Sequence, residues 1–342
     1  MLKRAISAAL LFTALLCTAV CGAEGVDALT YAVFPYLPDV EHYQALIESR
    51  WAELEPDVRL VRTEWNCYHD GRPEGIDVVM YDAIMLDQLV GEGWIQPISP
   101  DAVRDPEDIF PFALEGFTAG GALYGIPALL CGNFLIYDAG CEALAAAEHI
   151  TDLADAADLL VMNSEDPTNR RQYEIEAIAD ALGEANPSQD GGAEEVLELI
   201  DRLAVDAHKH DEDDQVALAY DSGIGEGYIG FSESMVLLRE RAERTRIKAI
   251  SFSDRENTPR VYADAAAVSA GVEGERYEKC LELMNVMADA DVLTALSVRE
   301  GAPQYLLLAR RTPYRALAGR FPIYAQLERL AGDEDNRVIR TP

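Results

Sequence analysis

Short apolar segments alternate with amphipathic helical segments along most of this chain, and this alternation limits the fold more than any other feature. The first strand-like segment is Leu29–Phe34, and apolar residues recur at helical spacing from Tyr43 to Leu54 before Pro56 ends the pattern. The other strand-like segments are Val58–Thr63, Ile76–Tyr81, Gly227–Phe231, Arg246–Ile250, Val261–Val268 and Tyr305–Ala309. Helical patterns occupy Ile84–Val90, most of Cys141–Ala207, Tyr277–Met287, Val292–Val298 and Phe321–Leu330. This order predicts an α/β fold with helices packed on sheets.

Size and charge narrow the possibilities further. The chain has 342 residues, more than one ordinary domain core holds, so we expect two lobes. It carries 61 Asp and Glu against 28 Lys and Arg, a formal net charge of −33. This negative charge repels nucleic-acid phosphates and anionic membrane surfaces, so the expected ligand is a cation or a neutral molecule. The same acidity would also keep an exported protein soluble.

The first 23 residues have the organisation of a secretory signal peptide. Lys3 and Arg4 precede an apolar run that ends at Val20, and the small residues after it predict cleavage following Ala23. The run is short for a membrane anchor. A lipoprotein signal with lipidation at Cys21 is the alternative, which the bulky Val20 disfavours. We therefore expect a secreted or periplasmic protein with no membrane insertion after cleavage.

The candidate reactive residues stand at the ends of apolar strands. The chain has no G-x-S-x-G elbow and no H-E-x-x-H pair, which excludes the commonest hydrolase sites. Cys131 ends an apolar segment and precedes a glycine, although a buried structural cysteine would give the same pattern. Glu233 follows the strand Gly227–Phe231, where a carboxylate could serve as a general base or merely stabilise a helix N-terminus. The cysteines after the signal could form disulfides or include a free thiol: Cys67, Cys131, Cys141 and Cys280.

Acidic and aromatic residues accompany the same strand ends. Asp82 and Asp264 each follow apolar strand residues, and Tyr36, Tyr68 and Tyr262 fall nearby. Tyrosines in such places usually only pack. A ring of them around a cleft, however, would stack on a flat cationic heterocycle.

Several short pieces, in the same order, resemble thiaminase I, also called thiamine pyridinylase. The pieces are Phe34-Pro35-Tyr36-Leu37-Pro38-Asp39, Tyr81-Asp82-Ala83-Ile84, Tyr124-Gly125-Ile126-Pro127 with Cys131 beyond it, Gly230-Phe231-Ser232-Glu233-Ser234-Met235, Pro303-Gln304-Tyr305-Leu306-Leu307 and Pro322-Ile323-Tyr324. The resemblance runs from about Leu29 to Arg340. It implies a two-lobed fold like the type II periplasmic solute-binding proteins, with the active site in a central cleft.

The resemblance also implies roles for individual residues. The nucleophilic cysteine of the family falls on Cys131 and its catalytic glutamate on Glu233. Its substrate-binding acids fall on Asp82 and Asp264, and its cleft tyrosines fall on Tyr36, Tyr68 and Tyr262. The sequence departs from the family where Phe34 and Phe231 replace expected tyrosines, and Tyr220 is our candidate for a further cleft tyrosine. Lost phenol hydroxyls would alter substrate affinity more than the type of reaction.

The implied reaction is a transfer that destroys thiamine. Addition of Cys131 to the pyrimidine would allow the thiazole to leave, and an exogenous base such as pyridine, an amine or a thiol would take its place. Glu233 would manage the proton, because no histidine has a suitable setting. The reaction needs no metal and no organic cofactor. Thiamine and the nucleophile are then the only expected partners of a monomeric protein.

Two other functions are compatible with parts of this sequence. An exported protein that binds thiamine or a pyrimidine for a transport system would share the fold, because fold does not fix function. Such a protein has no need of a thiol beside a carboxylate, so Cys131 favours the enzyme. A carbohydrate-binding protein would want a tryptophan-rich cleft, and only Trp51, Trp65 and Trp94 are present.

The lobes are expected to be discontinuous in sequence. The predicted first lobe comprises residues 24–131 and 256–301, and the second comprises residues 132–255 and 302–342. Cys131 would then stand at a crossing between the lobes.

Overall fold

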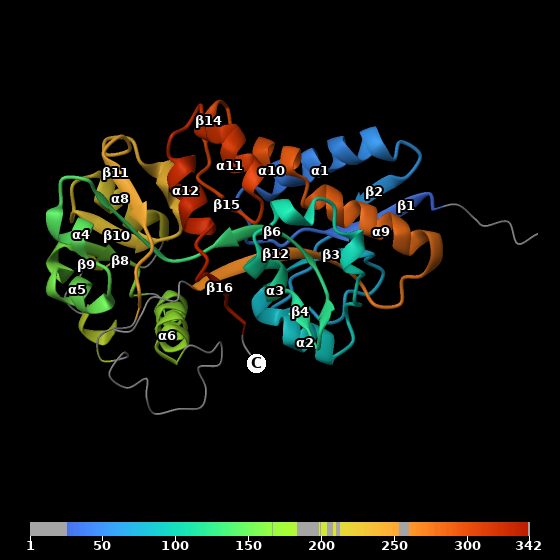
Figure 1. The fold of residues 1–342 in the computed structure, drawn as a ribbon, viewed down its shortest axis with the longest axis horizontal. Helices are drawn as coiled ribbons and strands as arrows, with labels where there is room; N and C mark the ends of the chain where they lie inside the picture. Colours follow the sequence, from blue (N-terminus) through green and yellow to red (C-terminus); the bar gives the residue numbers. More distant parts are fainter. Residues whose placement is uncertain are drawn as a thin grey trace, which may run out of the picture.

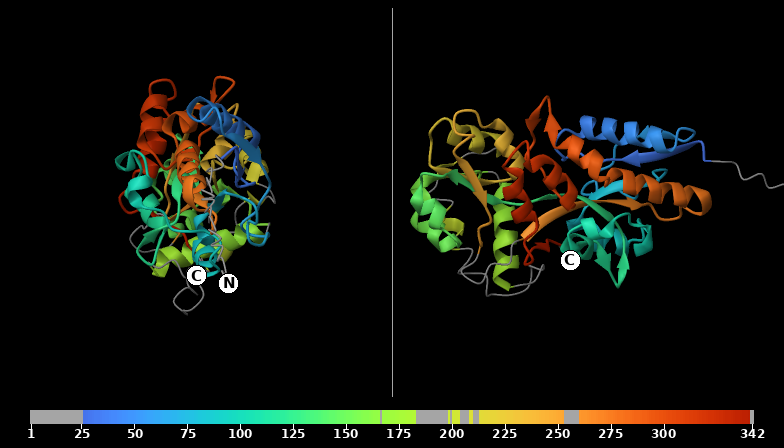
Figure 2. Two further views of the ribbon diagram at one scale, coloured as in Figure 1. Left: turned by 90° about the vertical axis from the view of Figure 1, so that its right-hand side faces the viewer. Right: turned by 45° about the horizontal axis from the view of Figure 1, so that its top comes forward.

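The computed structural model describes residues 26–165, 167–182, 198, 200–203, 208–209, 213–252 and 260–340. The predicted signal peptide, residues 1–23, lies outside the described residues. Two β-sheets with their helices lie side by side along the long axis of the molecule (Figure 1), and they remain separate in the turned view on the right of Figure 2.

The larger sheet is mixed and carries the chain in the order β15-β6-β12-β3-β1-β2, with β16 added beside β12. Its strands are β1 (Ala28–Ala32), β2 (Arg59–Arg62), β3 (Val78–Asp82), β6 (Ile126–Cys131), β12 (Arg260–Val268), β15 (Leu307–Leu308) and β16 (Arg337–Val338). β1 runs parallel to β2 and β3, whereas β12 is antiparallel to both β3 and β6. The long β12 therefore lies between the strand ends that carry Asp82 and Cys131.

Helices pack on the larger sheet through apolar faces. They are α1 (Val40–Leu54), α2 (Leu86–Gly91), α3 (Pro111–Gly116), α9 (Gly274–Met287), α10 (Ala290–Leu296), α11 (Arg311–Ala318) and α12 (Tyr324–Ala331). In α1 the buried face consists of Tyr43, Ile47 and Trp51, spaced four residues apart as a helix requires. Asp39 caps the N-terminus of this helix, because its carboxylate accepts a hydrogen bond from the His42 backbone amide at 3.4 Å.

The smaller sheet has the order β11-β7-β10-β8-β9. Its strands are β7 (Phe134–Asp138), β8 (Leu160–Met162), β9 (His208–Lys209), β10 (Gly227–Gly230) and β11 (Thr245–Lys248). The helices α4 (Glu142–Ala146), α5 (Ile150–Asp155), α6 (Pro167–Leu182) and α8 (Asp213–Asp221) belong to this part of the chain. Two short hairpins, β4 (Thr118–Ala119) with β5 (Ala122–Leu123) and β13 (Val298–Arg299) with β14 (Ala302–Pro303), complete the strands.

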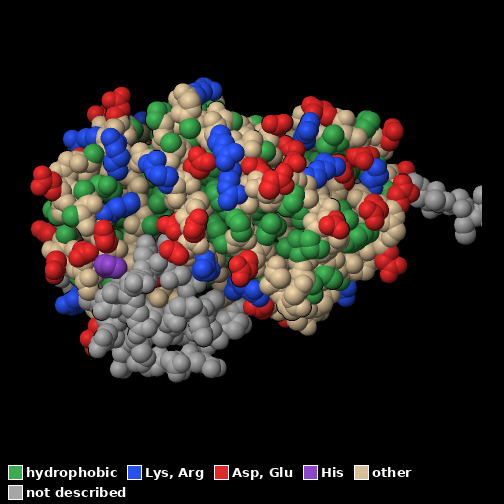
Figure 3. All heavy atoms as spheres, in the orientation of Figure 1, with side chains coloured by type: hydrophobic (Ala, Val, Ile, Leu, Met, Phe, Trp, Pro, Cys, Tyr) green, Lys and Arg blue, Asp and Glu red, His purple; other side chains and the backbone are tan. Residues whose placement is uncertain are grey.

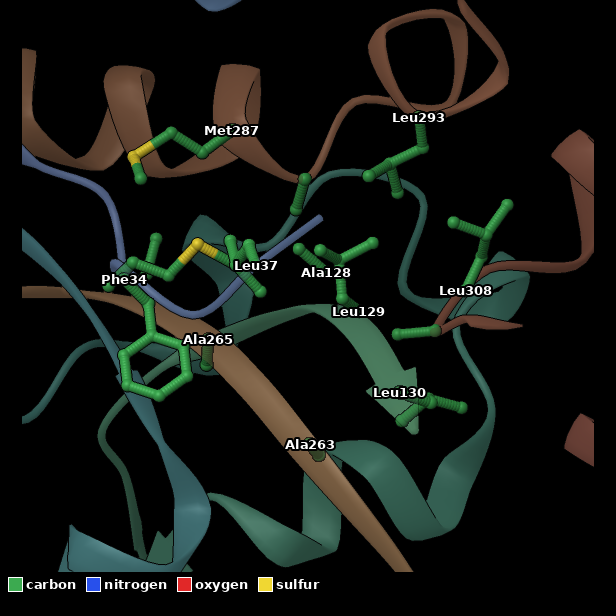
Figure 4. Packing of buried hydrophobic residues seen from close by; sticks show 14 of the residues in the cluster. Phe34, Leu37, Ala128, Leu129, Leu130, Ala263, Ala265, Met287, Leu293 and Leu308 are labelled. Atoms are coloured by element: carbon green, nitrogen blue, oxygen red, sulfur yellow. The ribbon is translucent and has the colours of Figure 1, made fainter. Parts of the chain in front are cut away.

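The buried apolar residues form two clusters, which lie on opposite faces of the smaller sheet. One apolar cluster runs through the larger sheet and includes Leu129, Leu130, Ala263 and Ala265, which Figure 4 shows on the neighbouring strands β6 and β12. The same cluster reaches the smaller sheet through alternate residues such as Ile136 and Tyr228. The residues between them, Leu135 and Ile229, point to the opposite face and belong to a second cluster.

Most of the predicted elements are present, with three differences. The segment from Cys141 to Ala207 was expected to be mostly helical, but it contains the buried strand β8, which is too short to show a period. The strand β7, directly after Asn133, was not predicted. Strands β15 and β16 pair with β6 and β12 in the larger sheet, although residues 302–342 were assigned to the second lobe. The other lobe boundaries stay a prediction.

The surface is strongly charged. Asp and Glu side chains are spread over the whole face drawn in Figure 3, with Lys and Arg side chains among them. In the described parts of the chain, no helix has both the length and the apolar character that crossing a membrane requires.

Candidate active site

Strand pairing brings four of the predicted residues onto one face of the larger sheet. Cys131, the last residue of β6, is directly opposite Tyr262 on β12. Two residues further along β12, Asp264 is directly opposite Asp82, the last residue of β3. Because directly opposed residues share a face, and residues two apart on a strand do so as well, all four side chains project from the same side.

Cys131 stands where the chain leaves the larger sheet for the smaller one. Gly132 and Asn133 separate it from β7, and its side chain is partly exposed. All four described cysteines are free thiols. Burial raises the pKa of the Cys131 thiol well above its ordinary value, and the negative charges of Glu233, Asp264 and Asp82 raise it further. The resting thiol is therefore protonated at neutral pH, so it needs a base to become a nucleophile.

Glu233 reaches this cluster from the smaller sheet. It lies in the short 3₁₀ turn Ser232–Leu237 directly after β10. The turn is held by Ser234, whose hydroxyl donates to the Phe231 carbonyl at 2.7 Å and lies 2.9 Å from the Tyr228 hydroxyl. After burial, the Glu233 charge is the largest influence on the pKa of Cys131. The structure thus brings a thiol and a carboxylate together from two different sheets.

Asp82 is both buried and held in a fixed orientation. One carboxylate oxygen accepts a hydrogen bond from the Ile84 backbone amide at 2.9 Å, and the other accepts one from the Tyr68 hydroxyl at 2.7 Å. Burial raises the pKa of Asp82 to about 6, against the lowering effect of these hydrogen bonds. Burial also raises the pKa of Asp264 well above its ordinary value, and the charge of Asp82 adds to that effect.

Aromatic rings stand beside Asp82 on the side of the larger sheet. Tyr36 is 61% exposed and Tyr68 is 38% exposed, which makes both available to a ligand. Their ring centroids are 6.4 Å apart, and both rings contact the buried Phe34. Phe34 therefore supports the exposed tyrosines from beneath, and it has no hydroxyl to offer a substrate. A flat, positively charged ring would find aromatic faces and carboxylates together here.

Tyr220 is not a cleft tyrosine. It is fully buried in the packing of α8, its hydroxyl lies 3.0 Å from the Thr245 hydroxyl, and Arg241 covers its ring. Our suggestion that it replaces a missing substrate contact was wrong, because the apolar face of α8 points into the core.

Sequence reasoning missed one charged residue of the site, Glu176 on α6. Its side chain is 2% exposed and its carboxylate accepts a hydrogen bond from the Asn133 amide at 2.7 Å. Its charge also acts on Cys131 and on Tyr262. The signal was available in the spacing, because Glu176 and Asp180 are one turn apart on α6 and lie among its buried apolar residues, which include Tyr173 and Ala177.

The site offers carboxylates, a thiol and phenols. Nowhere in the described segments do three or more His, Cys, Asp or Glu side chains come together as a metal-binding group. Asp82 and Asp264 could interact with a cation, and the arrangement of Cys131 with Glu233 suits covalent chemistry assisted by a carboxylate.

Comparisons with known proteins agree with this arrangement. The chain is 30% identical to Thiaminase-1 of Paenibacillus thiaminolyticus over 91% of its length and 83% of the relative. Its structure matches Clostridium botulinum thiaminase I in complex with thiamin, with a TM-score of 0.83 and 28% identity over 92% of this chain and 94% of the other. A match to the GacH receptor of Streptomyces glaucescens has a TM-score of 0.65 and 17% identity over 93% of this chain and 88% of that one. No family model matches. These neighbours confirm the predicted two-lobed fold of the type II periplasmic-binding-protein class.

Proposed function

This chain belongs to the thiaminase I family, and from that membership we propose that it transfers the pyrimidine part of thiamine from the thiazole to an exogenous base through a Cys131-linked intermediate. The observation that supports this best is the setting of Cys131. It lies opposite Tyr262, and the charges of Glu233, Asp264 and Asp82 act on its thiol. A binding protein gains nothing from such a thiol.

The first step is formation of a sulfur–carbon bond. Glu233 accepts the Cys131 proton as the sulfur adds to the pyrimidine carbon next to the ring nitrogen, and the electron pair moves into the ring. The raised pKa of the thiol makes this proton transfer necessary, because little thiolate is present beforehand. The bond from the methylene carbon to the thiazolium nitrogen then breaks, and the thiazole leaves with that electron pair as a neutral molecule.

The second half of the reaction reverses the addition. The incoming base, such as pyridine, an amine or a thiol, donates its electron pair to the methylene carbon. The ring electrons then expel the Cys131 sulfur, which recovers its proton from Glu233. Thiamine carries one positive charge on its thiazolium nitrogen. When the base is pyridine, the new product carries one positive charge on the pyridinium nitrogen, so the total charge is conserved. No metal and no organic cofactor takes part.

Asp82 and Asp264 would bind the aminopyrimidine. Two carboxyls facing each other across neighbouring strands can accept hydrogen bonds from amino and protonated ring nitrogens, and their charge stabilises a cationic adduct. Tyr68 fixes Asp82 through its hydroxyl, and the exposed rings of Tyr36 and Tyr68 supply aromatic surface. Tyr262, which is 6% exposed, would contribute its ring from the position opposite Cys131.

The setting of the protein is part of the same proposal. Residues 1–23 would direct export and be removed after Ala23, leaving a monomer that is secreted or periplasmic. The acidic surface would favour the approach of cationic thiamine over anionic competitors.

The test is to incubate the purified protein with thiamine and pyridine and to quantify free thiazole by chromatography. The wild-type protein should release thiazole in proportion to the pyridine adduct formed. Cys131→Ser should lose turnover, because a serine hydroxyl is a far weaker acid than a thiol, whereas Cys141→Ser should not. Tight thiamine binding without thiazole release by the wild-type protein would instead identify the alternative, a thiamine- or pyrimidine-binding protein of a transport system.

A further inference from the structure

Glu176 lies between two groups that flank Cys131. Through the 2.7 Å hydrogen bond from Asn133, it holds the link that follows β6, two residues beyond the thiol. The helix α6 that carries it belongs to the smaller lobe but packs against β12 of the larger one (Figure 1). Glu176 is thus a contact between the lobes at the point where the reactive strand crosses.

The other neighbour of Glu176 is Tyr262, the residue opposite Cys131. The Tyr262 hydroxyl is buried and has no hydrogen-bond partner of ordinary geometry among the described residues. Burial raises the pKa of this phenol, and Glu176 is the next largest influence after burial. A phenol hydroxyl this close to a carboxyl group can donate a hydrogen bond to the ionised form or accept one from the protonated form, so Tyr262 is coupled to the charge of Glu176.

We propose that Glu176 is a positioning residue for Cys131, which it acts on through Asn133 and Tyr262, and that it serves as a neutral carboxylic acid whose ionisation suppresses the thiol. This inference rests on the proposed role of Cys131 as nucleophile. It explains why a carboxyl group with 2% exposure stands beside a site that is already rich in negative charge.

Burial and the negative charge of Asp180 favour the neutral form of Glu176, and its hydrogen bonds oppose them. Burial raises its pKa to about 8, hydrogen bonds from Asn133 and Tyr262 lower it, and Asp180 one turn along α6 raises it. Seen from Cys131, Glu233 faces the thiol from the smaller sheet, while Asp264 and Asp82 face it from β12 and β3. Among the largest influences on the pKa of Cys131 and of Glu176, every charged group is a carboxyl group.

The sign of the pH effect follows from this arrangement. As the pH falls below about 8, Glu176 becomes mostly protonated and adds little charge next to the thiol. Above that pH it becomes a fourth carboxylate near Cys131, which opposes formation of the thiolate. The reactivity of Cys131 should then rise less steeply with pH than that of an isolated thiol.

The experiment measures alkylation of each cysteine by iodoacetamide from pH 6 to 10, with peptides resolved by mass spectrometry. In Glu176→Gln, which cannot ionise, Cys131 should react about three- to tenfold faster than in the wild-type protein at pH 9, and the difference should disappear near pH 6.5. The half-exposed Cys141 is the internal control and should react alike in both proteins. Glu174→Gln is the matched variant on α6, because Glu174 pairs with Arg170 and Arg171 on the surface and should leave the Cys131 profile unchanged.

Turnover separates a positioning role from general support of the fold. Glu176→Leu cannot accept from Asn133, so kcat should fall by roughly tenfold or more with a smaller change in KM, and Glu176→Gln should recover most of that loss at pH 7. Superimposable Cys131 alkylation profiles in the wild-type protein and Glu176→Gln would overturn the proposal. Because alkylation needs no thiamine, a shifted profile in a protein that releases no thiazole would refute the proposed function and leave the link between Glu176 and Cys131 standing.

Discussion

Asp82 and Asp264 are directly opposite each other on the antiparallel strands β3 and β12, and each is only 6–7% exposed. Burial raises the pKa of each carboxyl group, and the charges of Asp82 and Glu233 raise that of Asp264 further. Ionising both carboxyl groups costs free energy in the protein without a ligand, and becomes favourable when a cation binds beside them. The two acids are therefore a binding device whose strength depends on pH.

Thiamine affinity should increase with pH between about 5 and 7. The pKa of Asp82 is raised to about 6, so at pH 5 this carboxyl is largely protonated and presents no charge to the cation. Below pH 6, binding releases one proton from Asp82, so affinity should rise by up to about tenfold per pH unit. Above pH 6 the carboxyl group is already ionised, and affinity should level off. Calorimetric titration of the inactive Cys131→Ser variant would measure this without turnover, and a flat or falling profile would argue against Asp82 as a contact.

The same carboxyl should cost folding stability at high pH. The folded state holds the Asp82 proton more tightly than the unfolded chain, so the stability gained is complete below about pH 4 and is lost as the pH rises through 6. Asp82→Asn cannot ionise and should be more stable than wild type at pH 8 by roughly 1–2 kcal/mol, with little difference at pH 4. Urea unfolding at both pH values gives the comparison.

Asp77 provides the matched control for that measurement. It is as buried as Asp82, but both of its oxygens accept hydrogen bonds from Arg276 at 2.6 Å, and one also accepts from the Thr30 amide. Asp77→Asn removes a paired charge instead of an unpaired one, so it should destabilise the protein at pH 8. Stabilisation by both substitutions would mean that general negative charge, and not the Asp82–Asp264 pair, is responsible.

The sequence predicted the local elements of this structure better than the pairing of strands that are far apart in the chain. The apolar strands that end in Cys131 and Asp82, and the one that precedes Glu233, could be recognised from the sequence because burial leaves a pattern of apolar residues along the chain. The pairing of Cys131 with Tyr262 was not visible, because register depends on partners 131 residues apart in sequence. Strand β8 was not predicted because three residues are too few to show a strand pattern. Glu176 was not predicted because a buried acid in a helix is recognisable only once its partners are known.

Glu233→Gln should lower the rate much more than the affinity. The amide keeps the size and polarity of the side chain but cannot take the Cys131 proton, so turnover should fall by something like 10²–10⁴-fold. Asp82→Asn should behave differently and weaken thiamine binding together with turnover, because Asp82 would contact the ring. Rates from thiazole release and affinities from calorimetry separate the two roles. If both variants lost binding equally, Glu233 would be a substrate contact and another base would be needed.

The turn that carries Glu233 should depend on the buried hydroxyl of Tyr228. The single Ser234 hydroxyl proton is used on the Phe231 carbonyl at 2.7 Å, so the 2.9 Å contact requires Tyr228 to donate to Ser234. Tyr228→Phe retains the ring packing against Tyr220 but removes that donor. We expect a loss of about 1 kcal/mol in the free energy of unfolding, together with a severalfold lower kcat and a KM that changes less, because Glu233 is then held less firmly.

Tyr324→Phe distinguishes that local effect from a general loss of stability. Tyr324 is also fully buried, and its hydroxyl donates to the Ser297 carbonyl at 3.0 Å in the larger lobe, at a position that supports no residue of the proposed site. Removing its hydroxyl should cost a similar free energy of unfolding, about 1 kcal/mol, and leave kcat as it is. Urea unfolding and steady-state kinetics on both variants complete the comparison. Equal kcat values in the two variants would show that the Ser232–Leu237 turn positions Glu233 without help from Tyr228.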